Sequence, residues 1–473
     1  MKKKSWVRMI CIITTLMLLG TLLAACGEKP AVNDPTPTPT PSTSQTPSAE
    51  PTTQAPAEKV KLSWWTKDRH DMDYMKEVVA KFTQDNPNYE IDYNIQTENY
   101  PQNLELAFQS GQAPDIFVNQ QNAKYYVDRK MAEPLDSYLT DEMKARFGKL
   151  INVEFINTVG DKIYSLPNGG ITFRLVYNKD LFAKANLPGP PKTVDEMVEY
   201  AKKIAEVGKS EGAYGFAINM KNPNNSLFRC LDQIAFRSNA YYYDYKTGAY
   251  NFEPSKPVIA AFAKMYADGS MFPGIEGLDM DPMRSQFAEG KIGMYISGNW
   301  EVGVYANQFP PKCDWGAAPV PTLDGTAKAP SEIRNAGSYL YMSSESKHKN
   351  ETWKLLEYVY SDEVLVPYHE KGFAFSVVPS VLDKAKDAEL KGAAEFKTTD
   401  GIDGIWPLAP AGQGMKAEGK THYDVIAAVI LGATNLDEAI ADMNTRYNEA
   451  LEKDAASGKV KKIIIPDFDP SGL

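Results

Sequence analysis

Residues that commonly carry catalysis or hold metals are sparse in this chain, and their spacing builds neither a metal centre nor a nucleotide loop. The sequence has 4 His, which stand far apart at His70, His348, His369 and His422. No His-Glu-x-x-His zinc motif and no phosphate-binding P-loop occurs. Asp-x-Asp pairs are present, but none continues into a Ca²⁺ loop with its late Glu. We therefore predict a protein without metal, cofactor or enzyme activity, although the three-dimensional separation that a glycosidase carboxylate pair needs stays open.

The cysteines divide into two groups. The chain has 4 Cys, of which Cys11 and Cys26 belong to an N-terminal apolar segment and its end. Cys230 and Cys313 lie in the body of the chain. A disulfide between these two is one interpretation, and two buried thiols are at least as good a second.

Length and charge narrow the class of protein. The 473 residues are enough for two or three domains with large cores. A hydrophobic content of 43% and an aromatic content of 11% are typical of a folded globular protein. The chain carries 51 Lys+Arg against 61 Asp+Glu, a formal net charge of −10, whereas a nucleic-acid-binding protein should present a basic face. We expect no nucleic-acid partner.

The first 25 residues have the layout of a secretory signal peptide. Lys2 to Lys4 and Arg8 precede an apolar run from Met9 to Leu23. The run ends in Leu23-Ala24-Ala25-Cys26-Gly27, which resembles the lipobox of bacterial lipoproteins. That resemblance implies cleavage before Cys26 and lipidation of its thiol. The mature protein is then expected on the extracellular face of the cytoplasmic membrane, held there by its acyl chains.

Residues 26–58 are predicted to form a disordered tether. The stretch contains alternating Pro and Thr at 35–41 and almost no large apolar side chain, so it cannot build a core. At ~3.1 Å per residue in extended polyproline-II form, such a tether reaches at most ~100 Å. No later segment has the ~18 unbroken apolar residues that a membrane-spanning helix needs. The lipid anchor is therefore the predicted membrane attachment.

From Lys59 onward, strands and helices alternate along the sequence. The periodicity predicts strands at 60–65, 89–95, 115–118, 175–177 and 214–218. Helices are predicted from Met72 to before Asn86-Pro87 and at 104–108, 193–206, 254–268, 350–361, 363–371 and 435–453. A surface hairpin without a binding role is expected at 241–248. Such alternation indicates an α/β fold with mostly parallel sheets covered by helices, and the length favours two lobes.

Several segments, in order, resemble the extracellular solute-binding proteins of ABC importers, the maltose-binding-protein-like family. The segments are Phe82–Pro87, Gly111–Phe117, Asp161–Pro167, Tyr177–Phe182, Pro190–Glu196, Phe287–Met294, Gly298–Trp300 and Trp315–Pro321. Gly293 and Ser165 depart from the Ala and Gly that are usual there. The resemblance implies a two-lobed periplasmic-binding-protein-like fold of type II with hinge crossings. Its discontinuous lobes are 59–170 plus 318–371 and 174–314 plus 375–473, with a ligand between them.

The same resemblance points to residues that would hold a sugar. Aromatic rings suit the C–H faces of a sugar, and planar hydrogen-bonding groups suit its hydroxyls. The indicated ligand-binding residues are Trp65, Asp68, Arg69, Asn119, Gln121, Thr172, Arg174, Asn222, Asn224, Trp300, Trp406 and Tyr423. Other roles stay open for several of them. Trp65 could belong to the core, Asn119 could cap a helix, Arg174 could pair with an acidic neighbour, and the two Asn after Lys221 could form a turn.

The predicted function is that of a lipid-anchored monomer that captures a carbohydrate and delivers it to the permease of an ABC importer. Binding would shift the population toward a closed form. Aromatic and amide side chains, rather than a ring of Arg or Lys, favour a neutral oligosaccharide over an anion. Two alternatives are a secreted polysaccharide-active hydrolase and a ligand-sensing partner of a two-component system. The sequence does not indicate the sugar, its linkage or the permease.

Overall fold

The structure is a computed structural model that describes residues 59–96, 98–334 and 338–473. Residues Ala57–Leu473 form one compact unit. The predicted signal peptide 1–25, the lipidated Cys26 and the tether 26–58 lie outside the described residues.

The first sheet has five strands in the order β2-β1-β3-β14-β6. Strands β1 (Val60–Thr66), β2 (Tyr89–Ile95) and β3 (Ile116–Val118) run parallel, as the sequence predicts. Strand β14 (Leu340–Met342) pairs antiparallel with β3, and β6 (Ser165–Leu166) pairs antiparallel with β14 at the edge of the sheet. The chain therefore returns to this sheet after passing through a second one.

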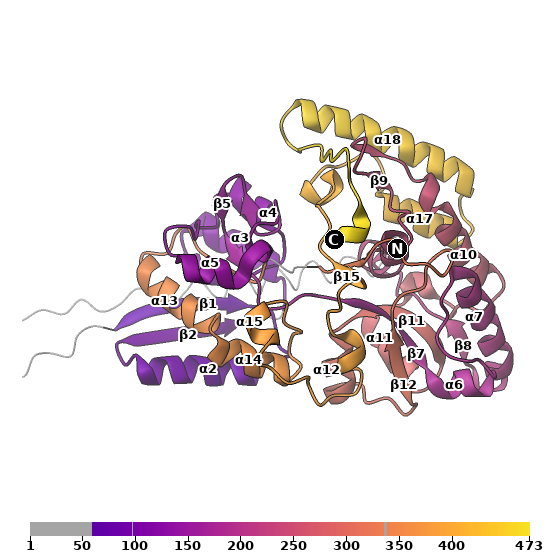
Figure 1. The fold of residues 1–473 in the computed structure, drawn as a ribbon, viewed down its shortest axis with the longest axis horizontal. Helices are drawn as coiled ribbons and strands as arrows, with labels where there is room; N and C mark the ends of the chain where they lie inside the picture. The colour runs from indigo at the N-terminus through magenta and orange to yellow at the C-terminus, as the bar shows by residue number, and fades with distance from the viewer. Residues whose placement is uncertain (1–58, 97, 335–337) are drawn as a thin grey trace, which may run out of the picture. The chain divides into compact units, whose positions relative to one another are not determined.

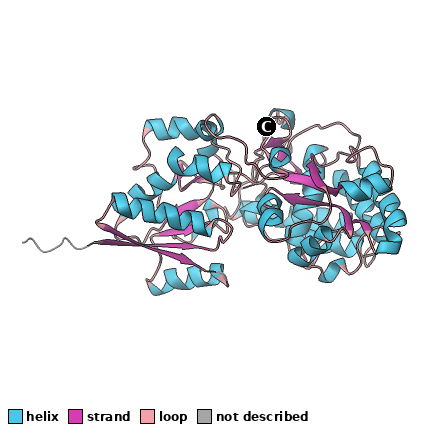
Figure 2. Cartoon of the chain, turned by 90° about the horizontal axis from the view of Figure 1, so that it is seen from below, coloured by secondary structure: helices cyan, strands magenta, loops and turns pink. Residues whose placement is uncertain are grey.

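Helices cover both faces of the first sheet (Figures 1 and 2). They are α2 (Met72–Asp85), α3 (Tyr100–Ser110), α4 (Ala123–Asp128), α5 (Asp141–Phe147), α13 (Lys349–Val359), α14 (Asp362–Glu370) and α15 (Pro379–Leu382), with the 3-10 turn η1 (Gly148–Ile151). Helix α2 buries Met75, Val78 and Phe82 at helical spacing and ends before Pro87, as predicted. The short pairs β4 (Thr158–Val159) and β5 (Lys162–Ile163) precede β6.

The second sheet has four strands in the order β12-β7-β11-β8. The prediction of a mostly parallel sheet is wrong here, because β7 (Phe173–Asn178) runs antiparallel to both β11 (Ile292–Gly298) and β12 (Trp315–Ala318). Only β8 (Tyr214–Phe216) is parallel to its neighbour β11. An apolar strand pattern marks burial but carries no information on strand direction.

The remaining elements surround the second sheet. The helices are α6 (Lys179–Lys184), α7 (Val194–Gly208), α8 (Pro223–Leu227), α9 (Gln233–Arg237), α10 (Lys256–Ala267), α11 (Met280–Ala288), α12 (Glu301–Asn307), α16 (Ala393–Phe396), α17 (His422–Ile430) and α18 (Leu436–Ala456). A π-helix, η3 (Phe228–Asp232), joins α8 to α9, and 3-10 turns lie at 209–211, 253–255, 275–277, 410–413 and 470–472. Helix α7 packs closely on the sheet, since a Cβ on Gly293 would lie 2.8 Å from the Gly215 carbonyl oxygen and 2.9 Å from Ile204 Cγ2. The Gly at 293 thus has a packing reason.

Two separate apolar cores match the two-lobe prediction in outline. One contains Leu62 to Leu166 and Tyr339 to Val381, and the other contains Leu175 to Ala329 and Phe375 to Val460. The predicted lobe boundaries differ from this division in two places. Val320 and Ala329 pack in the second core because backbone hydrogen bonds join Thr322 to Lys192 and Val194. Val378 and Val381 pack in the first core.

Three chain segments run side by side where the chain passes between the cores. Gly170 N donates to Phe375 O (3.0 Å), and Ile171 and Arg334 exchange backbone hydrogen bonds (2.9 and 3.0 Å). A Cβ on Gly169 would lie 2.8 Å from Phe375 O, so glycine permits this close approach. Leu150, Ile333 and Val377 form a small third core beside the crossings, with Ile405 packed against it.

Two further predictions concern individual side chains. A hairpin does form from β9 (Tyr243–Asp244) and β10 (Ala249–Tyr250), but its tyrosines are not at the surface. Tyr242, Tyr243 and Tyr245 are buried among the rings of the second core. Cys230 and Cys313 are both free thiols, so the second interpretation of the cysteines holds. Across the described ranges, no helix combines the length and apolar character that spanning a membrane requires.

Candidate ligand-binding cleft

The ends of two parallel strands bring several predicted residues of the first lobe together. Trp65 pairs in register with Phe117, so the loops after β1 and β3 leave the sheet side by side. Trp64 is buried in the core and Trp65 is half-buried at its edge, as strand alternation predicts. The hydroxyl of Tyr100 donates to Val118 O (2.9 Å) and ties down the end of β3.

The loop after β1 carries charged groups. Lys67 Nζ donates to Asp68 Oδ1 (2.8 Å), and the Asp68 backbone N–H donates to Thr66 Oγ1 (3.0 Å). Arg69 is exposed. Asp68 is therefore held by its neighbours, while Arg69 is available to solvent.

The loop after β3 presents amides. Asn119 is half-buried and Gln121 is exposed. The hydroxyl of Tyr126 accepts the N–H of Gln120 (2.8 Å) and of Gln121 (3.2 Å), which fixes the loop backbone. The cap of helix α4 is Asn122, not Asn119, and Asn122 Nδ2 also reaches Gly412 O (3.0 Å) from the second lobe. The amide of Asn119 is thus not used as a helix cap.

On the second lobe, Trp300 starts a wall of aromatic rings. It is half-buried, and its ring meets Phe173 edge-on at 6.0 Å between centroids. Its indole N–H donates to Glu301 Oε1 (2.8 Å), a buried carboxylate also held by Arg284. Phe173 in turn meets Phe228 at 5.6 Å. The indole is held in one orientation by these contacts.

A buried carboxyl group lies one turn beyond Phe228. Asp232 is fully buried, and the hydroxyls of Tyr423 and Tyr242 both donate to its Oδ2. Burial raises the pKa of Asp232 to about 8, against the opposing effect of the two tyrosine hydrogen bonds. Its Oδ1 has no hydrogen-bond partner among the described residues. At neutral pH this group is mostly protonated and can donate a hydrogen bond.

A second acid lies next to the first. The backbone N–H of Glu332 donates to Gln233 Oε1 (3.0 Å), and Glu332 Oε2 is buried without a partner in the described part of the chain. Burial raises the pKa of Glu332, and nearby Arg334 acts in the opposite direction. The Arg334 guanidinium lies 3.6 Å from the centroid of the Phe228 ring. The wall thus combines a ring, a cation and two acids.

Phe228 and Asp232 are the two ends of the π-helix η3. Single π-helical turns inside α-helices are rare and often occur at functional sites, because they reorient side chains. Here the insertion places an aromatic ring and an acid on the same wall. No signal of this insertion was found in the sequence.

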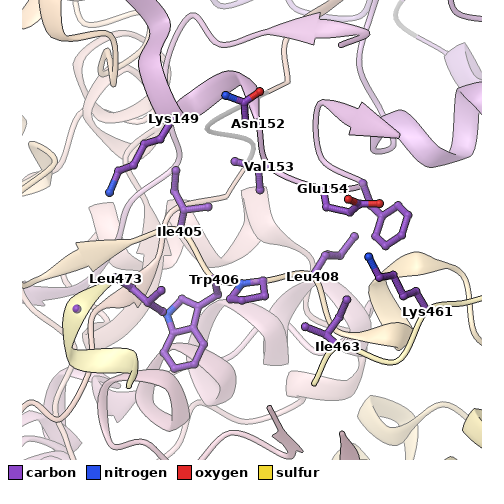
Figure 3. A pocket seen from close by; sticks show the side chains of 13 residues that line it. Lys149, Asn152, Val153, Glu154, Ile405, Trp406, Leu408, Lys461, Ile463 and Leu473 are labelled. Carbon is purple, nitrogen blue, oxygen red and sulfur yellow. The ribbon is translucent and has the colours of Figure 1, made fainter. Parts of the chain in front are cut away.

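Trp406 is the last ring of the aromatic wall, and it lines a cavity. Its ring packs at 4.6 Å from Phe236, and its indole N–H donates to Pro330 O (3.1 Å). The cavity has a volume of about 380 Å³ and is lined by Lys149, Asn152, Val153, Glu154, Phe155, Ile405, Trp406, Pro407, Leu408, Lys461, Ile463, Gly472 and Leu473. Figure 3 shows Asn152, Val153 and Glu154 on one wall and Trp406, Leu408 and Ile463 on the facing wall. Both lobes therefore contribute to it.

Two predicted contacts belong instead to the framework. Thr172 is fully buried, and its hydroxyl donates to Phe396 O (2.6 Å). Arg174 is 1% exposed and forms a bidentate ion pair with Asp403, 2.6 Å on each side. Its Nε donates to Glu395 O (2.8 Å). Because its donors are used internally, we reassign Arg174 to the ion pair that the sequence left open as an alternative.

Asn222 and Asn224 lie on a turn that leads into a helix. Asn222 is the N-cap of α8, and its side-chain oxygen accepts the N–H of Asn225 (3.4 Å). Both side chains are exposed. The structure does not bring either into contact with the aromatic wall, so the turn interpretation describes them better.

Sequence reasoning did not name several residues that pack around the predicted ones. Phe228, Asp232, Glu332 and Arg334 belong to the wall, and Lys149 and Glu154 belong to the cavity. The signal that could have pointed to Asp232 is an acid within a mostly apolar stretch, Leu231 to Phe236, in which Gln233 is the other polar residue. Such an acid is seldom buried without a role.

The arrangement can bind polar, ring-shaped molecules but holds no nucleophile in a catalytic setting. One Gly-x-Ser-x-Gly sequence occurs at Gly208–Gly212, but it ends α7, and Ser210 is exposed there. A hydrolase nucleophile needs a sharp turn from a strand into a helix. Within residues 59–96, 98–334 and 338–473, no group of three or more His, Cys, Asp and Glu could hold a metal ion.

Comparison with known proteins gives the family. The model of the family described as "bacterial extracellular solute-binding protein" matches residues 66–365. The galactooligosaccharide-binding protein of Bacillus subtilis is 30% identical over 260 residues, which cover 51% of this chain and 55% of that protein. The diacetylchitobiose-binding protein DasA of Streptomyces coelicolor is 24% identical over 395 residues, covering 80% and 87% respectively.

Solved structures agree in fold. The sugar-binding protein MalE from Xanthomonas citri has a TM-score of 0.60 at 20% identity and covers 85% of this chain and 100% of its own. RafE, solved in complex with raffinose, has a TM-score of 0.64 at 19% identity, covering 83% and 100%. The predicted α/β fold of two lobes is confirmed by these matches.

The family match spans the first-lobe loops, the crossings at 169–171 and 334, and the element that ends in Trp300. It confirms the resemblance drawn from the sequence motifs, and it makes the protein a binding protein rather than an enzyme. The chain, with its two cores and the aromatic wall between their crossings, belongs to the bacterial extracellular solute-binding proteins.

Proposed function

We propose that this protein captures a neutral oligosaccharide in the cleft and delivers it to the permease of an ABC importer. The observation that carries the proposal is the wall formed by Trp300, Phe228, Asp232, Tyr423 and Trp406, in which flat rings alternate with hydrogen-bonding groups. Rings bind the C–H faces of sugars, and acids and amides bind their hydroxyls. Relatives and structural neighbours whose names include galactooligosaccharide, diacetylchitobiose and raffinose support the same class.

The unpartnered acid oxygens favour a hydroxylated ligand over an anionic one. Asp232 Oδ1 and Glu332 Oε2 are buried without partners in the described chain, and neither acid, protonated or ionised, supplies the positive charge that an anion needs as its partner. A sugar hydroxyl both donates and accepts, so it can pair with either protonation state of these acids. On the first lobe, Asn119 and Gln121 offer amides that could complete the hydroxyl contacts on closure.

Ligand binding is tested on the full-length chain with a panel of raffinose, galactobiose, diacetylchitobiose, maltotriose and xylotriose. We expect a change in tryptophan fluorescence and a saturable heat of binding with one ligand per chain for at least one member. Buffer without sugar and glucuronate, an anionic sugar, serve as references. Absence of a binding signal with every neutral glycan would contradict the proposal, and so would tighter binding of glucuronate than of all of them.

Delivery and anchoring are separate parts of the proposal. Lipidation of Cys26 would hold the protein at the membrane surface, and the segment 26–58 would act as its tether. In the native bacterium, Cys26→Ser should release the protein into the medium and abolish incorporation of a labelled fatty acid. Deletion of the gene should abolish uptake of the bound sugar. Normal uptake after deletion would contradict the transport role and favour a sensing role.

A further inference from the structure

A second cavity lies in the second lobe. It has a volume of about 570 Å³, and its lining includes the two proline-containing loops 188–192 and 318–322 together with Tyr200 of α7 and Arg237 of α9. None of these residues lines the cavity beside Trp406. Its size suits a small molecule.

The cavity contains a buried cation without a counter-charge. Arg237, the last residue of α9, is 8% exposed, and its Nε is buried without a hydrogen-bond partner among the described residues. Within the described residues, its side chain donates one long hydrogen bond, from Nη1 to Ile402 O (3.4 Å). No carboxylate of the described chain lies within ion-pair distance of it.

The carboxylate of the nearby Asp403 is already paired with Arg174. Arg174 takes both oxygens of Asp403 at 2.6 Å, and the backbone N–H of Thr399 donates to one of them (3.0 Å). Burial lowers the pKa of the Arg237 guanidinium, and the positive charge of Arg174 lowers it further. The charge of Asp403 acts on Arg237 in the opposite direction, but its hydrogen bonds go to Arg174, so Arg237 has no ion-pair partner in the described chain. Burying an unpaired charge is unfavourable, so an anion at this place would relieve a real cost.

A second donor lies in the same cavity. Thr322 is 3% exposed, and its Oγ1 is buried without a partner in the part of the chain that the structure describes. The backbone of Thr322 is fixed, because its N–H donates to Lys192 O (3.0 Å) and its carbonyl accepts from Val194 N (2.9 Å). A guanidinium N–H and a hydroxyl in one cavity suit an oxyanion.

Apart from Lys192 and Glu196, the rest of the lining is mostly apolar. Five prolines restrict the backbone of the two loops, and Tyr200 adds an aromatic ring. Glu196 forms no ion pair with Arg237, and its Oε2 accepts the backbone N–H groups of Lys192 and Thr193 in the capping box of α7. A ligand that fits has one anionic end and a flat apolar body.

We propose that this cavity is a second ligand site, which binds a small carboxylate with an apolar or aromatic body. The carboxylate pairs with Arg237 and accepts from Thr322 Oγ1, and the body lies against Tyr200 and the prolines. This site is independent of the oligosaccharide proposal, because the two cavities share no residue.

The test uses benzoate as the probe and benzamide, its neutral isostere, as the matched control. With the full-length chain, benzoate should raise the midpoint of thermal unfolding and give a saturable calorimetric signal, whereas benzamide should give neither. Arg237→Met should weaken benzoate binding at least tenfold. Thr322→Val, which keeps the shape of the side chain, should weaken it by a smaller factor and covers the case in which the arginine variant does not fold.

A remote arginine variant separates the site from general charge effects. Arg446→Met removes an arginine of α18 that lines neither cavity and should leave benzoate binding unchanged. The proposal would be overturned by equal binding of benzamide and benzoate, by no binding of benzoate, or by unchanged binding in both Arg237→Met and Thr322→Val. Stabilisation by inorganic phosphate but not by benzoate would overturn the carboxylate class.

Discussion

The two faces of the proposed cleft are built in different ways. The first-lobe face consists of loops after β1 and β3, with Arg69 and Gln121 exposed, while Tyr126 fixes the backbone of the second loop and Lys67 holds Asp68 in the first. The second-lobe face consists of buried or half-buried rings and acids that hold one another, as Trp300 is held by Glu301 and Asp232 by Tyr423. One face is adaptable and the other is preorganised.

This difference suggests a division of labour in binding. Preorganised groups lose little entropy when a ligand arrives, so they contribute more affinity for each contact. Exposed amide and guanidinium side chains must be ordered on closure, so each contributes less. We expect contacts with the second-lobe wall to contribute most of the binding free energy, and contacts with the first-lobe loops to form when the two lobes close on the ligand.

The largest expected effect comes from breaking the support of the wall. Arg174→Met would leave Asp403 buried without its partner, and we expect a loss of about 3–5 kcal/mol in the free energy of unfolding. Chemical denaturation measures this. The matched first-lobe variant is Arg146→Met, which removes an ion pair with Asp362 whose partners are 18% and 26% exposed. A smaller loss is expected there, and equal losses would contradict the claim that the second lobe is the more tightly held.

The next effect concerns the wall itself. Trp300→Ala should lower affinity for the best oligosaccharide by about 2 kcal/mol, because a preoriented ring contributes strongly at the centre of a site. The fold should stay intact, since Trp300 is only half-buried. Calorimetric titration measures the loss. Trp300→Phe keeps a ring but loses the hydrogen bond to Glu301, so its affinity should lie between those of wild type and Trp300→Ala. Unchanged affinity in Trp300→Ala would remove this residue from the site.

The comparison also explains what could be predicted from the sequence. Strand β2 has the predicted bounds, and the alternation at Trp64 and Trp65 places one ring inside and one at the edge. These features depend on the local periodicity of apolar residues, which can be read directly from the sequence. Asp403, the partner of Arg174, is 229 residues away in the chain. The two tyrosines that donate to Asp232 are Tyr423 in α17 and Tyr242 just before β9. No local pattern encodes such distant partners, so the second-lobe wall was found only in part.

The direction of the second sheet escaped prediction for a related reason. Strand β11 is buried along its whole length, and its apolar sequence fits a parallel or an antiparallel neighbour equally well. The chain enters β7 directly from the crossing at 169–171, and this entry sets its antiparallel direction against β11. The direction is thus a property of the topology and not of the strand sequence.

A pH experiment sharpens the account of the buried acid. The pKa of Asp232 is about 8 in the folded state, above its ordinary value of about 4 in an unfolded chain. The folded state therefore holds a proton that the unfolded state has released, and stability falls as pH rises between these values, by about 1.4 kcal/mol per unit. From pH 6.5 to 7.5, wild type should lose about this much relative to Asp232→Asn. The pKa of His422 is lowered to about 3, so its opposite effect lies below this window. Parallel pH profiles for the two proteins would show that Asp232 is ionised in the fold.

The smallest expected effect is on the first-lobe face. Gln121 is exposed and lies on a loop whose backbone Tyr126 already fixes, so its side chain must be ordered anew in a closed complex. The hydrogen bonds that it gains are offset by that ordering and by lost water, and Gln121→Ala should cost less than about 1 kcal/mol of binding free energy. Tyr126→Phe is the sharper variant, because it leaves the amide in place but frees two backbone N–H groups of the loop. If closure depends on the loop backbone, Tyr126→Phe should slow association, measured by stopped-flow fluorescence, more than Gln121→Ala does. A loss in Gln121→Ala that matches that of Trp300→Ala would mean that the first-lobe face is as preorganised as the wall opposite.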